Sequence, residues 1–585
     1  MGWRDHVADI RKNEGQSQAF DSTGNCVILA GPGSGKTQTI TMKVARLLDE
    51  EVQFPRRIAF VTYSNGCANE IRSRLQKLGV VDDKRVEIAT VHGLCLTELI
   101  IPFAHLAGVG VPNPLVVASA GQRRQFMNDA YRAVHGGGAL PNWLETKASA
   151  LRMEMPDRTS VEWLNIQSEE RRFVDEYERR LRTAALIDFD GMVLAGLQLI
   201  EGFEWVRKVV RAKFPILVVD EYQDLGVSLH RMVITLMQKA GVRVIAVGDP
   251  DQAIFGFTGA RPELLLQLAE LPGVEKVYLK NNYRCAPAII NASSVVLGKA
   301  VRGAAGGGRV TIHAIPPNVA AQVANALDEI VPAILAANED WTLGDIAFVY
   351  RSFREGSLVA AGADERELAY SRYDNGSPIR RTRLLEWMGS VARWCVTPLG
   401  RADNSIHDLS LALLRLMGLA ADSSAGQALH RKFLGFIFKG RHAEMPLRKW
   451  TAGMLKLFLA GAFAERASLV DEAKAVDDLL EACREGNPLA HFTVQNLAMQ
   501  GRDPDRLYLT TLHSAKGLEF NAVIMIGIEE GAFPHYLSDD KGIAEDRRLF
   551  YVGVTRAKHE VHLMYSNTAS IFLKDLLVRG VAACL

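Results

Sequence analysis

The chain has 585 residues, 48% of them apolar, and a formal net charge of +1. This length and apolar content predict a globular protein of three or four domains. The near-neutral charge excludes a global polycation, but not a motor that holds nucleic-acid phosphates in a local groove.

The seven cysteines are scattered, odd in number and without a C-x-x-C pair. This pattern indicates neither a disulfide framework nor a zinc or iron–sulfur site, and it fits a reducing cytoplasm. We find no apolar run of the roughly 18 residues that a membrane helix needs, and the N-terminal segment does not resemble a signal peptide. We therefore expect a soluble cytoplasmic protein with no membrane partner.

The first predicted element is a helix that begins near Asn13, in the segment NEGQSQAF. A glutamine amide such as that of Gln16 donates and accepts at once, so it can pair with the edge of an adenine. Taken alone, a glutamine here is more often a solvated surface residue.

Residues 27–41, VILAGPGSGKTQTIT, combine an apolar strand, a Gly-rich loop and the start of a helix. This is the [AG]-x-x-x-x-G-K-[ST] phosphate loop in its strand–loop–helix context. Its free N–H groups and the helix dipole favour a polyphosphate, with Lys36 on the β- and γ-phosphates and the Thr37 hydroxyl on Mg²⁺. The predicted ATP-binding residues of the loop are Ala30, Gly31, Pro32, Gly33, Ser34, Gly35, Lys36 and Thr37.

Two strand–turn–helix segments follow, at 58–75 and 86–99. Such turns lie at the carboxyl edge of a parallel sheet, where ligands bind. Hydroxyl, aromatic and imidazole side chains there suit the bases and phosphates of single-stranded DNA, although each turn alone could be an ordinary one. The DNA-binding candidates in these turns are Thr62, Tyr63, Asn65, Thr90 and His92.

From about 101 to 183 the strand–turn–helix alternation stops, and charged helical stretches predict an inserted helical subdomain. Its arginine cluster at 179–182 is either a DNA-backbone contact or a solvated face. The segment Leu186–Asp190 returns the chain to the main domain.

The next strand, within FPILVVDEYQD at 214–224, delivers Asp220 and Glu221 to its carboxyl end. Asp220 can hold the Mg²⁺ that Thr37 also ligates, and Glu221 can accept a proton from the attacking water. Adjacent carboxylates are often only a solvated loop, but a preceding apolar strand and a phosphate loop in the same chain make a catalytic pair the better interpretation.

A further strand at 242–247 leads to Gln252, which can sense the γ-phosphate, and to Phe255 and Phe257, which either stack on bases or belong to the core. Between a strand and a helix in 277–290, Tyr283 can stack on adenine and Arg284 can neutralise phosphate charge.

The order of these segments resembles the motif series of the UvrD/Rep/PcrA-type superfamily 1 DNA helicases. The matching segments are NEGQSQAF, AGPGSGKT, TYSN, TVHGLC, DEYQD, GDPDQAIFGF and NNYR. In the C-terminal third, LTTLHSAKGLEF resembles the fifth motif, which implies that His513 contacts DNA and that Glu519 contacts ATP. The segment EDRRLFYVGVTRAK resembles the sixth motif, with Arg556 in the finger position of the ATP site. Together the motifs span residues 13–558.

The resemblance implies an α/β fold of two RecA-like P-loop NTPase cores with parallel sheets, each carrying a mainly helical insert. The implied division is 1–100 and 184–275 for the first core, 101–183 for its insert, 276–385 and 503–585 for the second core, and 386–502 for a shortened accessory insert. ATP and Mg²⁺ are the implied cofactors, bound where the cores meet. The first core would supply Lys36, Thr37, Asp220, Glu221 and Gln252, and the second Arg284 and Arg556.

The implied activity is ATP-dependent translocation and unwinding of single-stranded or tailed duplex DNA, 3′→5′. One alternative is a DNA-stimulated ATPase that unwinds little and regulates a partner nuclease, like the UvrD-like subunit of Gabija-type phage defence. Another is a binding protein with a vestigial ATPase, against which the full set of hydrolytic residues argues. DNA repair and antiviral defence are both open as pathways.

Overall fold

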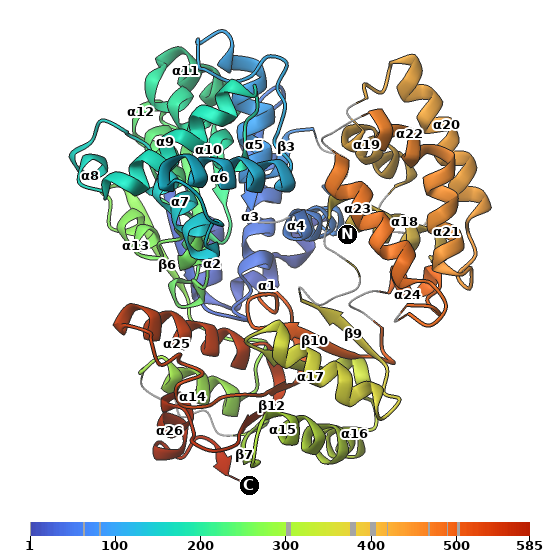
Figure 1. The fold of residues 1–585 in the computed structure, drawn as a ribbon. Helices are drawn as coiled ribbons and strands as arrows, with labels where there is room; N and C mark the ends of the chain where they lie inside the picture. The colour runs from blue at the N-terminus through green and yellow to red at the C-terminus, as the bar shows by residue number, and fades with distance from the viewer. Residues whose placement is uncertain are drawn as a thin grey trace. The chain divides into compact units, whose positions relative to one another are not determined.

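The protein is described by a computed structural model for residues 2–62, 65–80, 84–299, 306–374, 379, 382–397, 405–417, 419–465, 469–487, 489–499 and 503–584. It divides into two compact units. The first comprises the described residues up to Cys285 together with Ala544–Tyr551. The second comprises those of Ala286–Ile543 and from Val552 onward (Figure 1).

The first unit is built on a six-stranded sheet whose paired strands all run parallel. Its order is β3 (Val86–Thr90), β2 (Ile58–Thr62), β4 (Ile216–Val219), β5 (Arg243–Gly248), β1 (Asn25–Ala30) and β6 (Val274–Leu279). Because the strands are parallel, the polar segments that follow β1, β2, β4 and β5 leave the same edge of the sheet.

Helices cover both faces of this sheet, so its strands read as nearly continuous apolar runs. Cys26 and Ile28 pack toward α3 (Lys36–Glu50) and α4 (Asn65–Lys77). Val27 and Leu29 pack into the opposite cluster, whose helices are η2 (Cys95–Ala104), α10 (Phe189–Gly202), α11 (Glu204–Lys213), α12 (Val227–Ala240) and α13 (Glu263–Ala269). The N-terminal helices are η1 (Trp3–His6), α1 (Val7–Arg11) and α2 (Glu14–Asp21).

One expectation about the boundary of the first core is wrong. Strand β6 pairs with β1 along its whole length, whereas we expected the second core to begin at residue 276. Tyr283 and Arg284 follow β6 and therefore belong to the first unit. The remaining domain limits stay predictions.

The helices between η2 and α10 have a core of their own. They are α6 (Ala120–His135), α7 (Asn142–Glu154), α8 (Val161–Leu164) and α9 (Ser168–Thr183). Met127, Trp163, Phe173 and Tyr177 are buried among them.

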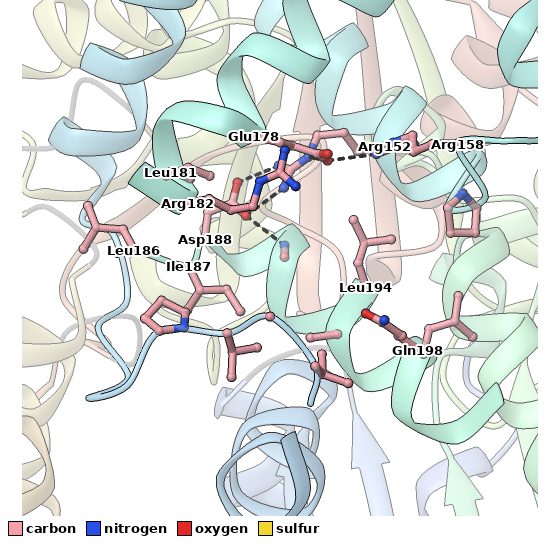
Figure 2. A pocket seen from close by; sticks show the side chains of 18 of the residues that line it. Arg152, Arg158, Glu178, Leu181, Arg182, Leu186, Ile187, Asp188, Leu194 and Gln198 are labelled. Carbon is pink, nitrogen blue, oxygen red and sulfur yellow. Dashed lines mark hydrogen bonds and ion pairs between the residues drawn. The ribbon is translucent and has the colours of Figure 1, made fainter. Parts of the chain in front are cut away.

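A buried ion pair joins this insert to the sheet-covering helix α10. Arg152 of α7 donates twice to Asp188, at 2.6 and 3.0 Å, and once to Glu178 of α9, at 2.9 Å. Asp188 also accepts from Gly191 N at 2.8 Å, so it is the N-cap of α10. Figure 2 shows these side chains beside a cavity of about 750 Å³, whose wall includes Arg182 and Gln198.

The second unit contains a seven-stranded sheet, again with parallel pairing. Its order is β13 (Ala583–Cys584), β7 (Arg309–Ala314), β12 (Ala557–Tyr565), β11 (Phe520–Met525), β8 (Ile346–Tyr350), β10 (Leu507–Thr511) and β9 (Tyr370–Tyr373). Its helices are α14 (Pro287–Val296), α15 (Val319–Asn325), η6 (Ala326–Ile330), α16 (Val331–Ala337), α17 (Phe353–Asp364) and α26 (Ile571–Val578). Helix α25 (Asp540–Val554) is divided, because its residues Ala544–Tyr551 belong to the first unit. The two parallel sheets confirm the predicted α/β fold with two RecA-like cores.

Between β9 and β10 the chain forms a second helical body, with Trp387, Phe433 and Trp450 in its core. Its helices are α18 (Arg383–Val396), α19 (Ile406–Leu416), α20 (Ser424–Lys439), α21 (Leu447–Met454), η8 (Leu455–Leu459), α22 (Ala460–Glu465), α23 (Val470–Ala482) and α24 (Val494–Ala498).

One described helical stretch, Val319–Ala337, is long and apolar enough to span a bilayer by length and composition. Val323, Leu327 and Ile334 on this stretch are buried in the core of the second sheet. A core helix of a globular protein passes the same test, so the stretch is weak evidence for a membrane span.

We expect Arg152→Ala to lower the free energy of unfolding by about 3–5 kcal/mol, because it leaves the buried Asp188 carboxylate without its cation. Urea unfolding followed by tryptophan fluorescence measures this loss. Arg179→Ala is the matched control: Arg179 pairs with Glu176 on the surface, and its loss should cost about 0–1 kcal/mol. Equal losses for the two variants would contradict a stabilising role for the buried pair.

Candidate functional site

The phosphate loop lies between β1 and α3, at the carboxyl edge of the first sheet. Gly33 and Gly35 have φ of 66° and 82°, in the left-handed region that favours glycine. A Cβ at Gly33 would lie 2.5 Å from Arg284 Cβ, and one at Gly35 would lie 2.4 Å from Gln16 Nε2. Both glycines are therefore required by backbone conformation and by close neighbours.

Two segments that are distant in sequence meet at this loop. Gln16 is 4% exposed and donates through Nε2 to Ser34 O at 3.2 Å. Tyr283 N donates to Gly33 O at 2.8 Å, and its hydroxyl accepts from Asn13 Nδ2 at 2.8 Å. The structure thus brings the predicted adenine-contacting residues, Gln16 and Tyr283, to the same side of the phosphate loop. The Tyr283 side chain is 62% exposed and can offer a ring face.

The carboxylates predicted after β4 face the phosphate-loop lysine. Lys36 Nζ lies 3.6 Å from Glu221 Oε1. Burial raises the pKa of Asp220 to about 7, with the neighbouring Glu221 adding to the rise and Lys36 opposing it. Glu221 itself has φ of 53°, a left-handed conformation that is rare for a residue with a Cβ. Backbone strain of this kind concentrates at functional sites, where the surrounding structure maintains it.

Sequence reasoning missed Gln223 and Asp249, which form a hydrogen-bonded chain that begins at Glu221. Gln223 donates a hydrogen bond through Nε2 to Glu221 Oε2. Its Oε1 accepts a hydrogen bond from Asp249 N at 3.0 Å. Asp249 is buried directly after β5 and accepts from Gln252 Nε2 at 2.5 Å. Burial raises the pKa of Asp249, and Lys36 opposes that rise. The missed signal was an acid directly after an apolar strand, the same signal that identified Asp220.

The predicted DNA-binding residues of the first unit fall into two groups. Thr90 caps α5 (Val91–Leu94), because its Oγ1 accepts from Gly93 N at 3.2 Å. His92 contacts Phe189 edge-to-face, with ring centroids 5.3 Å apart. Phe189, which is 40% exposed, was not predicted, although it lies in the segment that returns the chain to the main domain.

The second group comprises Phe255 and Phe257, whose ring centroids lie 6.2 Å apart. Phe257 is 51% exposed, so it does not belong to the core, which was the alternative interpretation. Thr62 ends β2 with its hydroxyl buried and, among the described residues, without a hydrogen-bond partner. Tyr63 lies outside the described residues, as does the side chain of Asn65, the first residue of α4.

The remaining predicted residues belong to the second unit. His513 lies in the turn after β10, where its carbonyl accepts from Lys516 N at 3.3 Å. Glu519 pairs with Lys558 at 2.9 Å. Arg556 is 1% exposed and donates to the backbone carbonyls of Val552 and Leu518, at 3.0 and 3.3 Å. Arg556 and Arg284 therefore lie in different units, rather than both in the second as expected.

Comparison with known proteins gives two family matches. Residues 12–272 match the UvrD/REP helicase N-terminal domain, and residues 468–568 match the UvrD-like helicase C-terminal domain. The N-terminal match includes the phosphate loop, Asp220, Glu221 and Gln252, and the C-terminal match includes Arg556.

Several curated proteins are similar over nearly the whole chain. ATP-dependent DNA helicase Rep of Escherichia coli (strain K12) is 26% identical, over 94% of this chain and 90% of Rep. DNA helicase II of the same strain is 26% identical, over 97% of this chain and 86% of the relative. ATP-dependent DNA helicase UvrD1 of Mycobacterium tuberculosis (strain CDC 1551 / Oshkosh) is 27% identical, over 94% of this chain and 82% of the relative. The two domain matches and this coverage show that the chain belongs to the UvrD/Rep family of helicases.

Proposed function

We propose that this protein is an ATP-dependent DNA translocase and helicase that moves 3′→5′ on single-stranded or tailed duplex DNA. The observation that carries the proposal is the ion pair between Lys36 and Glu221 beside the buried Asp220, at the mouth of the phosphate loop. A lysine, a base and a metal-binding carboxylate in this arrangement are the parts that phosphoryl transfer requires.

In the proposed hydrolysis, the loop amides and Lys36 bind the phosphates of ATP. Glu221 accepts a proton from the attacking water, and Gln252 orients that water or senses the γ-phosphate. Gln16 pairs with the adenine edge and Tyr283 stacks on its ring. Arg284 and Arg556 neutralise the transferring phosphate, and Glu519 contacts the nucleotide from the second unit.

The residues present fit a magnesium ion. Thr37 and Asp220 offer hydroxyl and carboxylate oxygens, which are the ligands that Mg²⁺ prefers. The carboxyl groups of Asp220, Glu221 and Asp249 all interact with the ammonium group of Lys36, so a divalent cation would offset an excess of negative charge. When bound with ATP, the ion neutralises charge on the β- and γ-phosphates.

Translocation requires surfaces that grip successive bases. We assign this role to Phe255 and Phe257, with His92 and Phe189 as a second aromatic pair, because base–aromatic stacking tolerates any sequence. Contacts to the strand are further assigned to Thr62, Tyr63, Asn65, Thr90 and His513. ATP-driven closure of the two cores would move these contacts along one strand by a small step.

The names of the relatives support DNA as the substrate: they describe ATP-dependent DNA helicases. We infer a cytoplasmic protein from this likeness. The alternative function is a DNA-stimulated ATPase that regulates a partner nuclease and unwinds little DNA. A strand-displacement experiment distinguishes this alternative from the proposed helicase.

Glu221→Gln should lower kcat about 10²- to 10⁴-fold and leave KM for ATP within about twofold, because the amide cannot accept the proton of the water. Phosphate release with saturating single-stranded DNA measures both constants. Glu204→Gln, on the exposed surface of α11, is the control and should leave both unchanged. Equal kcat in Glu221→Gln and wild-type protein would refute the assigned base.

Mg²⁺ binding should strengthen as pH rises through about 7, because Asp220 must lose its proton to ligate the ion. The Mg²⁺ concentration that half-saturates binding of a fluorescent non-hydrolysable ATP analogue should be about tenfold higher at pH 6 than at pH 8. Asp220→Asn is the control, because in this variant the half-saturating Mg²⁺ concentration should change with pH only through titration of the nucleotide itself. An identical pH profile in this variant would contradict the role of Asp220.

Duplex DNA with a 3′ single-stranded tail should be unwound in an ATP-dependent manner, whereas duplex with a 5′ tail or blunt ends should not. A gel-based strand-displacement assay on the three substrates tests this polarity. Displacement of streptavidin from the end of a single strand, without unwinding of any duplex, would instead support the translocating ATPase. Preference for the 5′ tail would overturn the assigned direction.

A further inference from the structure

Lys43 is a fully buried lysine on α3, two turns beyond Lys36. Its ammonium group donates to Ala19 O at 2.8 Å, to Phe20 O at 3.2 Å and to Ser22 O at 2.7 Å. It also lies 2.8 Å from Ser22 Oγ. These acceptors form the C-terminal end of α2, where helix carbonyls lack intrahelical partners and carry partial negative charge. The bonds of Lys43 therefore fasten α2 to the helix that follows the phosphate loop.

Burial of an ammonium group is costly unless its hydrogen bonds are satisfied. Burial lowers the pKa of Lys43 to about 7, and nearby Arg243 adds to the lowering. An apolar side chain of similar length would avoid this cost, so packing alone does not account for a lysine here. What the ammonium adds is a directional link to three carbonyl oxygens.

The opposite end of α2 carries the predicted adenine-reading residue. Asn13 caps this end by accepting from Gln16 N at 3.0 Å, and the Gln16 amide reaches Ser34 O of the phosphate loop. Gln16 lies six residues before Ser22, a distance of about 9 Å along the helix axis, so α2 acts as a short rigid strut between the Gln16 amide and the acceptors of Lys43. A shift at one end of such a strut is transmitted to the other.

We propose that Lys43 is a positioning residue for base selection: it fixes α2 against α3 so that the Gln16 amide meets the edge of adenine. This inference rests on the proposed function, because it assumes that ATP occupies the phosphate loop. Adenine offers a donor and an acceptor on the edge that a glutamine amide contacts, whereas guanine offers acceptors. A glutamine displaced by the loss of Lys43 would lose this discrimination but leave the phosphate contacts intact.

The test is Lys43→Met, which removes the ammonium group and keeps most of the apolar stem. KM and kcat for ATP and for GTP are measured with saturating single-stranded DNA, for the wild-type chain, Lys43→Met, Gln16→Ala and the double variant. We expect KM for ATP to rise about tenfold in Lys43→Met, equivalent to about 1.4 kcal/mol, with kcat and KM for GTP within about twofold of wild type. The double variant should be no worse than Gln16→Ala alone, because both changes remove the same contact.

Lys12→Met, at an exposed lysine paired with Asp9, is the matched control and should leave the ATP-to-GTP preference unchanged. If Lys43→Met does not fold, Ser22→Ala removes one acceptor of the same ammonium group and should shift the preference in the same direction by a smaller amount. Equal effects on ATP and GTP, a fall in kcat alone, or additive effects of the two single variants would overturn the inference. A wild-type chain that hydrolyses no nucleotide would overturn the proposed function itself, whereas a preference lost in Gln16→Ala but kept in Lys43→Met would overturn only the role of Lys43.

Discussion

The interaction on which the first unit depends is that of the Lys36 ammonium group with the acidic side chains at the carboxyl edge of its sheet. Glu221 Oε1 lies 3.6 Å from Lys36 Nζ, and the buried carboxyl groups of Asp220 and Asp249 interact with the same charge. Burial strengthens these interactions because little water is present to screen them. It also raises the pKa of both aspartates, so this part of the site favours added positive charge. That is the electrostatic condition for accepting a nucleotide together with a divalent cation.

Local backbone geometry and hydrogen bonds maintain this arrangement. The left-handed conformation of Glu221 turns the chain sharply after β4, and Gln223 then joins the Glu221 carboxylate to the backbone of Asp249. The segments after β4 and β5 are therefore coupled by one amide side chain. A change in charge at Glu221 would alter its hydrogen bond with Gln223. Through Gln223 it would also affect Asp249 and the hydrogen bond that Asp249 accepts from Gln252.

The candidate base-contacting residues depend instead on the close approach of side chains to the backbone of the phosphate loop. Gly33 and Gly35 leave room for Arg284 and Gln16, and Asn13 ties the Tyr283 hydroxyl to the start of α2. Helix α2 is in turn attached to α3 through Lys43 at its far end. The candidate base-contacting and phosphate-contacting residues thus form one connected structure, although they come from three separate segments of the chain.

The sequence by itself determined the parts of this protein that local pattern specifies. Apolar strands followed by polar turns, and the glycines and lysine of the phosphate loop, have short-range signatures, so the α/β fold and the positions of Lys36, Asp220 and Glu221 could be predicted. The tertiary structure alone decided that β6 joins the first sheet and takes Tyr283 and Arg284 with it, because strand pairing is a long-range contact without a local signal. It also decided that Thr90 caps a helix, that Gln223 links Glu221 to the backbone of Asp249, and that Lys43 is buried. Each of these facts depends on which distant segment supplies the partner, and residue spacing along the chain does not encode that choice.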